Sequence, residues 1–275
     1  MTYLLSDEGC QALRLLAAQP ILYAFDFDGT LAPISSNRDA VKMSPLCLKW
    51  LQKLSERAAC AVVSGRALAD VSPRVNGAVQ HVIGNHGVES PLMPAATLAQ
   101  AEAICAQWSQ EMAAGMGQSL TSLGAEIEDK RYSLTVHFRR AADPVESSAK
   151  ALTLLSRLIP PPHLIAGKYS LNALPSGLGG KGPAALALME HLRLRGLFYI
   201  GDEETDETVF ALTRGLTMGV RVGQQAGSHA GFYLHHQGEV EEVLRFLVHR
   251  MDRTPESPHP DISTCEDDRP SSRRG

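Results

Sequence analysis

The chain has 275 residues, of which 44% are hydrophobic and 20% charged, and its formal net charge is −4. This length allows one large domain or two modest ones, and the apolar content is ample for a core. The acidic balance argues against a nucleic-acid-binding surface, and no apolar run reaches the length that spans a membrane. A small phosphorylated substrate stays open, because local charge in a cleft matters more than the total.

The five cysteines are scattered along the chain, and no Cys-x-x-Cys pair occurs. An odd, scattered set predicts neither a zinc site nor a disulfide framework. The N-terminus has no basic region followed by an apolar core, so we expect no secretory signal. Reduced thiols fit a cytoplasmic location best.

The first third of the chain alternates helices with buried strands. We expect a helix over residues 5–18, and a polar loop over 35–43. A second helix begins at Ser44 and Pro45, and its expected apolar stripe consists of Leu46, Trp50, Leu51 and Leu54. A third helix starts near Leu68 and is expected to break at Pro73. Apolar runs of strand length begin at Ile21, Ala58 and His81, so the order predicts a parallel α/β sheet with right-handed crossovers.

Residues 89–176 depart from this pattern and predict an inserted α+β module. Its order is helix–strand–strand, twice over, and the expected elements lie at 95–114, 125–130, 132–139, 143–158, 163–166 and 169–174. The first two strands alternate strictly between apolar and polar residues. Such alternation predicts an antiparallel sheet with one covered face and one open face.

The α/β pattern resumes after the module. The expected elements are a helix from Lys181 to 194, a strand at 197–200, a helix at 205–213, short strands at 216–220 and 231–234, and a helix at 238–251. We therefore predict a Rossmann-like α/β core with a parallel sheet, formed by residues 1–88 and 177–251, and an α+β cap formed by 89–176. Residues 252–275 are rich in Pro, Ser and charged residues and predict a disordered tail.

Two carboxylates follow the first buried strand. Asp26 and Asp28 lie two residues apart, so they project to the same side if the strand geometry persists. Two acids held together repel each other unless a cation or a shared proton compensates, which is the arrangement of a Mg²⁺-assisted phosphoryl-transfer site. The simpler alternative is a solvated Asp-Gly turn.

Polar residues follow the other strands as well. Ser64, Asn85 with His86, and Asp202 with Asp206 come after apolar runs, and Lys181 opens a helix after a glycine-rich stretch. Because the carboxyl ends of parallel strands share one sheet edge, we expect these groups to meet. Taken singly, each has a structural explanation: a turn, a solvated lysine, or acids that cap a helix.

In this order, Asp26-Phe27-Asp28-Gly29-Thr30, Ser64-Gly65-Arg66, Lys181 and Gly201-Asp202 resemble the four motifs of the haloacid dehalogenase (HAD) superfamily phosphatases. The insert falls between the second and third motifs, as in members with the larger, C2-type cap. Three further stretches are similar to trehalose-6-phosphate phosphatases, namely Leu31-Ala32-Pro33-Ile34, Gly84-Asn85-His86-Gly87, and Glu128-Asp129-Lys130 with His137-Phe138-Arg139. The resemblance covers roughly residues 20–250.

The resemblance implies a role for each core residue. Asp26 would be the nucleophile and Asp28 the general acid and base. Mg²⁺ would be held by Asp26, the backbone carbonyl of Asp28, and Asp202. Ser64 and Lys181 would bind the phosphate, and Asp206 would support the metal site or hold Lys181.

The resemblance also implies a sugar phosphate, trehalose 6-phosphate, as substrate. The residues expected to bind it are Gly65, Arg66, His86, Glu128, Lys130, His137, Arg139 and Asn172. Two positions depart from the family pattern: Asn172 replaces a glutamate that contacts the sugar, and Glu203 replaces an aspartate. The alternatives are a phosphatase of another sugar phosphate (sucrose phosphate or mannosylglycerate phosphate), a non-catalytic sugar-phosphate-binding regulator, and, for the cap residues, a merely solvated face.

Overall fold

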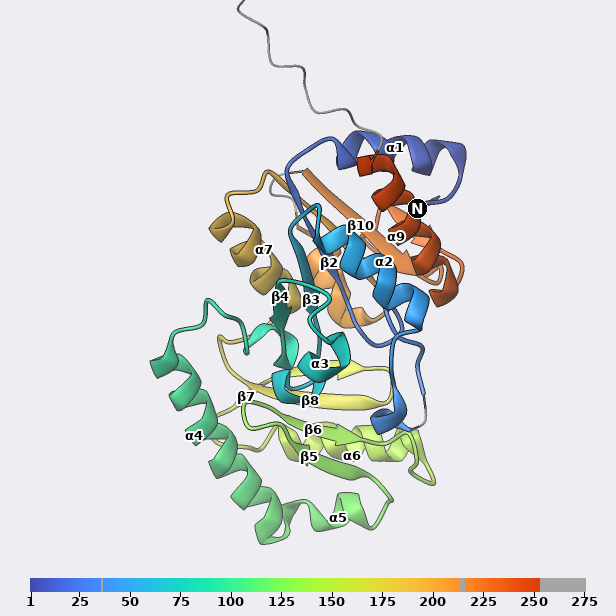
Figure 1. Ribbon diagram of the computed structural model, residues 1–275. Coiled ribbons are helices and arrows are strands. Elements are labelled where there is room, and N and C mark those ends of the chain that lie inside the picture. Colours follow the sequence, from blue (N-terminus) through green and yellow to red (C-terminus); the bar gives the residue numbers. More distant parts are fainter. Residues whose placement is uncertain (36, 213–215, 253–275) are drawn as a thin grey trace, which may run out of the picture.

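The computed structural model describes residues 1–35, 37–212 and 216–252, and two β-sheets organise them (Figure 1). The larger sheet has the strand order β1-β11-β10-β9-β2-β3-β4, and all its pairs are parallel. Its strands are β1 (Thr2–Tyr3), β2 (Ile21–Phe25), β3 (Cys60–Val63), β4 (His81–Ile83), β9 (Gly196–Gly201), β10 (Leu216–Val222) and β11 (Phe232–Leu234). The predicted α/β class is confirmed, and β1 is an addition whose two residues are too few to form a sequence pattern.

Helices cover both faces of the larger sheet. In β2, Tyr23 and Phe25 contact one apolar cluster, and Leu22 and Ala24 contact another. The first cluster packs under α1 (Asp7–Ala17), α2 (Pro45–Ser55), α3 (Leu68–Val75) and α9 (Val240–Asp252), and the second under α7 (Lys181–His191) and α8 (Glu207–Phe210). Because both faces are covered, β2 is apolar throughout, as a parallel strand requires.

Two details of the predicted helices are wrong. Pro73 lies inside α3 and does not break it, because Val71 and Val75 on the same helix stay fully buried and hold it to the core. Leu46 is 55% exposed, whereas Cys47, Leu51 and Leu54 are fully buried. Positions 47, 51 and 54 have the i, i+4, i+7 spacing of one helix face, and Leu46 lies beside that face.

The smaller sheet has the order β5-β6-β8-β7, and it is antiparallel as predicted. Its strands are β5 (Glu126–Asp129), β6 (Leu134–His137), β7 (Pro162–Gly167) and β8 (Ser170–Pro175). Helices α4 (Ala95–Glu111), α5 (Gln118–Thr121) and α6 (Pro144–Leu155) accompany it, and its apolar face packs on Trp108 and Leu155. We call this α+β part the cap.

The opposite face of the cap sheet is not open, contrary to the sequence-based expectation. Ser133, Thr135 and Asn172 are 0%, 1% and 3% exposed. This face lies against the larger domain, where Ser133 Oγ donates to Asn85 Oδ1 at 2.7 Å. Ser133, Thr135 and Asn172 therefore form an interface within the molecule, whereas Glu126 and Arg139 on the same face are exposed.

Several predicted helices differ from the observed ones at their ends. The helix expected at 95–114 is α4 up to Glu111 and then a π-turn over Met112–Met116, and the helix from Lys181 ends at His191. The helix expected at 205–213 is divided into a 3₁₀ turn (Glu204–Asp206) and α8, and a 3₁₀ turn (Gln237–Glu239) precedes α9. Asp252 ends α9, and the rest of the predicted tail lies outside the described residues. No helix in the described ranges is long and apolar enough to cross a membrane.

Leu51→Ala should lower the free energy of unfolding by about 2–5 kcal/mol, because it leaves a cavity between α2 and the sheet. Leu46→Ala, on the same helix, is the matched control, and its cost should stay below about 0.5 kcal/mol because the side chain already lies in water. Urea unfolding of both variants measures the difference. Equal costs would contradict the assignment of the buried face of α2.

Candidate active site

The two carboxylates of the first motif lie at the end of the central strand β2. Asp26 follows the last residue of this strand, and its backbone N–H donates to the Ile200 carbonyl of β9 at 2.9 Å. Its side chain is 4% exposed, whereas that of Asp28 is 32% exposed. Strands β9 and β3 flank β2, so Asp202 and Ser64 at their ends arrive beside these acids.

The ammonium group of Lys181 is buried between two carboxylates. Its Nζ donates to Asp26 Oδ1 at 2.7 Å and to Asp206 Oδ1 at 2.8 Å. Although burial opposes the charge, the carboxylates of Asp206 and Asp26 raise the pKa of Lys181, which therefore stays a cation. Burial also raises the pKa of Asp26 well above its usual range, and the charge of Lys181 only partly offsets this rise.

Asp206 organises the neighbouring loop. Besides Lys181, it accepts hydrogen bonds from the hydroxyl of Tyr199 at 2.7 Å and from the backbone N–H groups of Asp202 and Glu203 at 2.9 Å each. Sequence reasoning missed Tyr199, although a tyrosine within an apolar strand is itself a signal, because its buried hydroxyl needs a partner. Asp206 thus holds Lys181 and the loop that carries Asp202.

The residues of this cluster fit a divalent cation. One carboxylate oxygen from each of Asp26, Asp202 and Asp206 lies within 4.8 Å of the others. Asp206 is occupied by its four donors, but Asp202 Oδ1 is buried without a hydrogen-bond partner among the described residues. Burial, with the charges of Asp206 and Glu203, raises the pKa of Asp202 to about 7. A buried carboxylate oxygen without a donor is a suitable ligand for a hard cation such as Mg²⁺.

Gly29 makes room for Asp202. Its φ is +82°, a left-handed conformation that glycine adopts readily, and a Cβ at this position would collide with the Asp202 carboxylate. A glycine directly after two acids in a sequence suggests that a bound group can approach the backbone there. In the structure, the group that approaches is the side chain of Asp202.

The second motif supplies a hydroxyl group and a guanidinium group. Ser64 is buried, and its Oγ accepts from the Arg66 backbone N–H at 3.1 Å. The Arg66 guanidinium binds both oxygens of Asp28, at 2.7 and 2.8 Å, and its third nitrogen donates to Asp70 at 2.7 Å. In this structure the Arg66 guanidinium is therefore bound to carboxylates.

The Asn85–His86 loop joins the core to the cap. Asn85 Nδ2 donates to the Lys130 carbonyl at 3.1 Å. The His86 ring packs against Gly65, where an added Cβ would lie 2.5 Å from His86 Cε1. Burial lowers the pKa of His86 well below its usual range, and the charges of Lys130 and Lys181 act in the same direction, so the ring is neutral.

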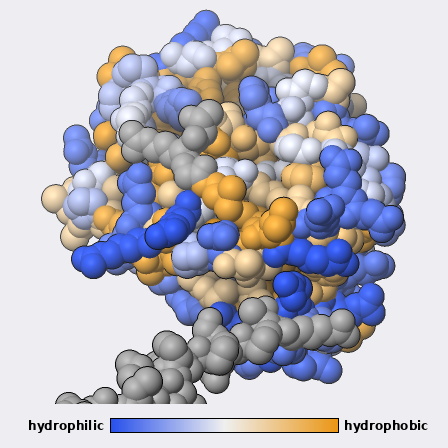
Figure 2. All heavy atoms as spheres, turned by 90° about the horizontal axis from the view of Figure 1, so that it is seen from above, coloured by the Kyte–Doolittle hydropathy of each residue, from blue (hydrophilic) through white to orange (hydrophobic). Residues whose placement is uncertain are grey.

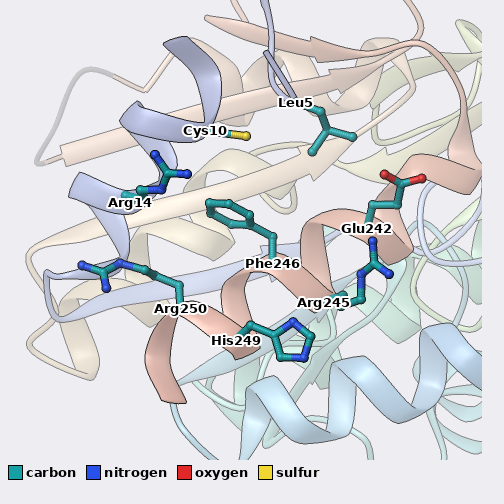
Figure 3. Close-up of a pocket in the computed structure, with 8 residues that line it drawn as sticks. All are labelled: Leu5, Cys10, Arg14, Glu242, Arg245, Phe246, His249 and Arg250. Atoms are coloured by element: carbon teal, nitrogen blue, oxygen red, sulfur yellow. The ribbon is translucent and has the colours of Figure 1, made fainter. Parts of the chain in front are cut away.

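A cavity of about 230 Å³ lies beside Lys181. His86 and Lys181 line it from the core, together with Thr205, and Ile165 lines it from the cap strand β7. A larger cavity, of about 580 Å³, lies between α1 and α9 and is lined by Arg14, Phe246 and Arg250 among others (Figure 3). It lies away from the cap, on a face where hydrophobic and hydrophilic side chains are intermixed (Figures 1 and 2). None of the predicted site residues lines this larger cavity.

Three of the predicted cap residues reach the core side of the cap. Glu128 receives two hydrogen bonds from Arg38, at 2.6 and 2.5 Å, and lies 2.8 Å from His137 Nε2. Lys130 Nζ donates to the Gly65 carbonyl at 3.0 Å. Arg139 is not brought to this group; it is exposed, and its guanidinium lies over the ring of Tyr169. Sequence reasoning missed Arg38, which it placed in an irregular loop.

Asn172 is held within the cap sheet. Its Oδ1 accepts from Thr135 Oγ1 at 2.7 Å, and its Nδ2 donates to the Ile165 carbonyl at 3.1 Å. A glutamate at this position could accept from Thr135 but could not donate to Ile165. The amide therefore suits this environment, and both of its ends already have partners in the cap.

Comparisons with known proteins show the family to which the chain belongs. The family model for trehalose-phosphatase matches residues 24–232. The chain is 34% identical over 204 residues to the trehalose-phosphate phosphatase of Mycobacterium tuberculosis, covering 71% of this chain and 52% of the relative, and 33% identical over 203 residues to that of Mycobacterium avium, covering 70% and 51%. The chain thus spans about half the length of the curated relatives it matches. The solved C-terminal domain of Candida albicans trehalose-6-phosphate phosphatase shares the fold, with a TM-score of 0.67 and 21% identity over 87% of this chain and 96% of that one.

In the phosphatase reaction expected from the sequence, Gly29→Ala should lower phosphate release about 100-fold, because the new methyl group displaces Asp202 by an appreciable fraction of an ångström. Gly77→Ala is the matched control: Gly77 also has a positive φ, of +70°, but nothing lies within 4 Å of the added Cβ. Both variants should lose about 1 kcal/mol of stability from backbone strain. If Gly77→Ala lost as much activity as Gly29→Ala, the collision with Asp202 would not be the cause.

Metal-free protein should lose stability as the pH rises from about 4 to about 7. The pKa of Asp202 is about 7 in the folded chain, against 3.8 for an ordinary aspartate, so the folded state binds more protons in this window and deprotonation favours unfolding. Asp202→Asn removes this titration, and its free energy of unfolding in EDTA should fall less steeply over the same range. Asp7→Asn, at the exposed start of α1, should keep the wild-type slope.

Proposed function

Because this chain belongs to the trehalose-phosphatase family, we propose that it hydrolyses trehalose 6-phosphate to trehalose and phosphate, with Mg²⁺ as its cofactor. The observation that supports this most is the buried cluster in which Lys181 lies between Asp26 and Asp206, with Asp202 beside it and Asp28 nearby. A small phosphoryl group is the kind of anion that such a cluster can bind and transfer. A trehalose-phosphate synthase would supply the substrate, as a neighbour in the same pathway.

In the first step, the Asp26 carboxylate attacks the phosphorus atom and the bond from phosphorus to the sugar oxygen breaks. The phosphoryl group becomes an aspartyl phosphate on Asp26. Lys181, 2.7 Å from Asp26 Oδ1, holds the carboxylate in one orientation and offers positive charge to the phosphoryl oxygens. Ser64 Oγ, at the end of the adjacent strand, would donate to one of those oxygens.

Asp28 completes both steps as acid and then base. In its protonated form it gives a proton to the departing sugar oxygen, and as a carboxylate it then takes a proton from the water that hydrolyses the aspartyl phosphate. The two hydrogen bonds from Arg66 hold Asp28 at the mouth of the site. Its side chain is about one-third exposed, so substrate and water can reach it.

Asp26, Asp202 and the backbone carbonyl of Asp28 would hold Mg²⁺, which when bound supplies positive charge against the phosphate. The unpartnered Oδ1 of Asp202 supports this assignment. Asp206 would not bind the metal itself. It would position the site through its hydrogen bonds from Lys181 and from the backbone N–H of Asp202.

The cap would bind the sugar. Glu128, Lys130 and His137 lie on the cap face that meets the core, close to Gly65 and Arg66, and their charged groups suit hydroxyl partners. His86 lines the cavity beside Lys181 and would contact the phosphate end of the substrate. With both ends of its amide paired, Asn172 would act on the sugar indirectly, through the shape of the cap sheet.

Phosphate release should be at least about 10-fold faster, in kcat/KM, from trehalose 6-phosphate than from glucose 6-phosphate or sucrose 6-phosphate, because only the correct disaccharide satisfies the cap. EDTA should abolish it and Mg²⁺ should restore it. Asp26→Asn should lower it at least about 1,000-fold, whereas Asp7→Asn should leave it unchanged. No preference for trehalose 6-phosphate, or full activity of Asp26→Asn, would contradict the proposal.

A further inference from the structure

Arginine side chains hold the loop before α2 in place by hydrogen bonds to its carbonyl groups. Residues Arg38–Ala40 form a 3₁₀ turn with Asn37 as its N-cap. Three carbonyl groups of this loop accept hydrogen bonds from buried or half-buried arginines: Arg38 O from Arg66 at 3.1 Å, and Asp39 O and Val41 O from Arg74 at 2.9 and 2.8 Å. A loop whose carbonyls are bound in this way has a defined position, although its sequence is irregular.

One carboxylate fixes both of these arginines. Asp70, in α3, accepts from Arg66 Nη1 at 2.7 Å and from Arg74 Nη2 at 2.7 Å. Asp70, Arg66 and Arg74 come from one short stretch of chain, and their side chains are 32%, 7% and 16% exposed. They form a rigid support for the 3₁₀ turn.

From this support, the Arg38 side chain crosses from the core to the cap. Its guanidinium donates to both oxygens of Glu128, at 2.6 and 2.5 Å, and its Nη1 lies 2.7 Å from His137 Nε2. Arg38 and Glu128 are 90 residues apart in the chain. A planar fork on a carboxylate fixes orientation as well as distance, which a lysine in the same place would not do.

The same turn is connected to the acid of the core. Arg66 donates to the Arg38 carbonyl through Nη2, and the same Nη2 and its Nε bind the two oxygens of Asp28. Glu128 in the cap is therefore joined to Asp28 in the core through Arg38 and then Arg66. We call Arg38 and Arg66 the arginine link.

We propose that Arg38 is a positioning residue that couples closure of the cap to the placement of Asp28. This inference rests on the proposed function for the roles of Glu128 and Asp28. With the cap closed, Glu128 clamps Arg38 onto the turn that Arg66 also holds, and Arg66 in turn fixes Asp28. When the cap opens, Glu128 moves away from Arg38, and the 3₁₀ turn is then held less firmly.

The fork also leaves Glu128 able to bind the sugar. Each carboxylate oxygen has two lone pairs, and Arg38 uses one on each, while His137 Nε2 also lies 2.8 Å from Oε2, so a lone pair remains on Oε1. The side chain of Glu128 stays 24% exposed, so a sugar hydroxyl can donate to a remaining lone pair. A substrate that carries a sugar therefore strengthens the closed state, whereas a small phosphate ester that does not reach Glu128 gains nothing from Arg38.

The test compares two substrates. Arg38→Gln should lower kcat/KM for trehalose 6-phosphate about 10-fold, with part of the loss in kcat. The same substitution should change kcat/KM for p-nitrophenyl phosphate less than about twofold. Arg38→Lys, which keeps the charge but not the fork, should lie between wild type and Arg38→Gln. Arg57→Gln is the matched control, because Arg57 is paired with Asp252 and Glu56 elsewhere on the core. An equal loss on both substrates would overturn the proposal, since it would indicate a merely structural role.

A double-mutant cycle and solution scattering complete the test. In the Glu128→Gln background, Arg38→Gln should have little further effect on trehalose 6-phosphate, whereas full additivity would overturn the coupling. Small-angle X-ray scattering of the full chain without ligand should show a larger radius of gyration for Arg38→Gln than for wild type or Arg57→Gln. This measurement needs no substrate. If wild type does not prefer trehalose 6-phosphate, the proposed function fails, and an unchanged radius would by itself overturn the role of Arg38.

Discussion

The buried ammonium group of Lys181 is the charge on which the acidic end of the parallel sheet depends. It lies 2.7 Å from Asp26 and 2.8 Å from Asp206, and Asp202 is part of the same cluster. Burial raises the pKa values of Asp26 and Asp202, and the neighbouring carboxylates raise them further, because one ammonium group cannot balance three carboxylates. The charge that is missing is what a bound divalent cation would supply.

This crowding of carboxylates also explains which backbone positions lack a side chain. A Cβ on Gly29 would collide with Asp202, and a Cβ on Gly201 would collide with Asp206. Gly65 likewise leaves room for the His86 ring close to the backbone. The glycines are therefore part of the site because the acids and the imidazole occupy the space that their side chains would need.

The cap meets the core mainly through polar contacts. Lys130 reaches the Gly65 carbonyl, Ser133 reaches Asn85, and Arg38 reaches Glu128. A small apolar cluster, formed by Val88, Ala101, Tyr132 and Leu174, lies near the two linkers, which are the segments 88–94 and 176–180 that join the cap to the larger domain. Polar groups can be hydrated again when two domains separate, so such an interface is compatible with opening and closing about the linkers.

The sequence by itself determined the strand ends and the residues that follow them. Apolar runs, caps and turn residues act over a few positions, so the local pattern placed Asp26, Ser64 and Asp202 after strands of one sheet edge and Lys181 at a helix start. The parallel sheet itself was predicted correctly. Local pattern also showed where the antiparallel cap sheet begins and ends, to within a few residues.

Only the tertiary structure decided which charges are paired. Arg66 binds Asp28, Arg38 binds Glu128, and the polar face of the cap sheet is buried against the core. These outcomes depend on which surfaces meet across 38 or 90 residues of chain. No local pattern encodes such a meeting, because a side chain that looks solvated in sequence becomes a binding partner only when packing brings a second element beside it.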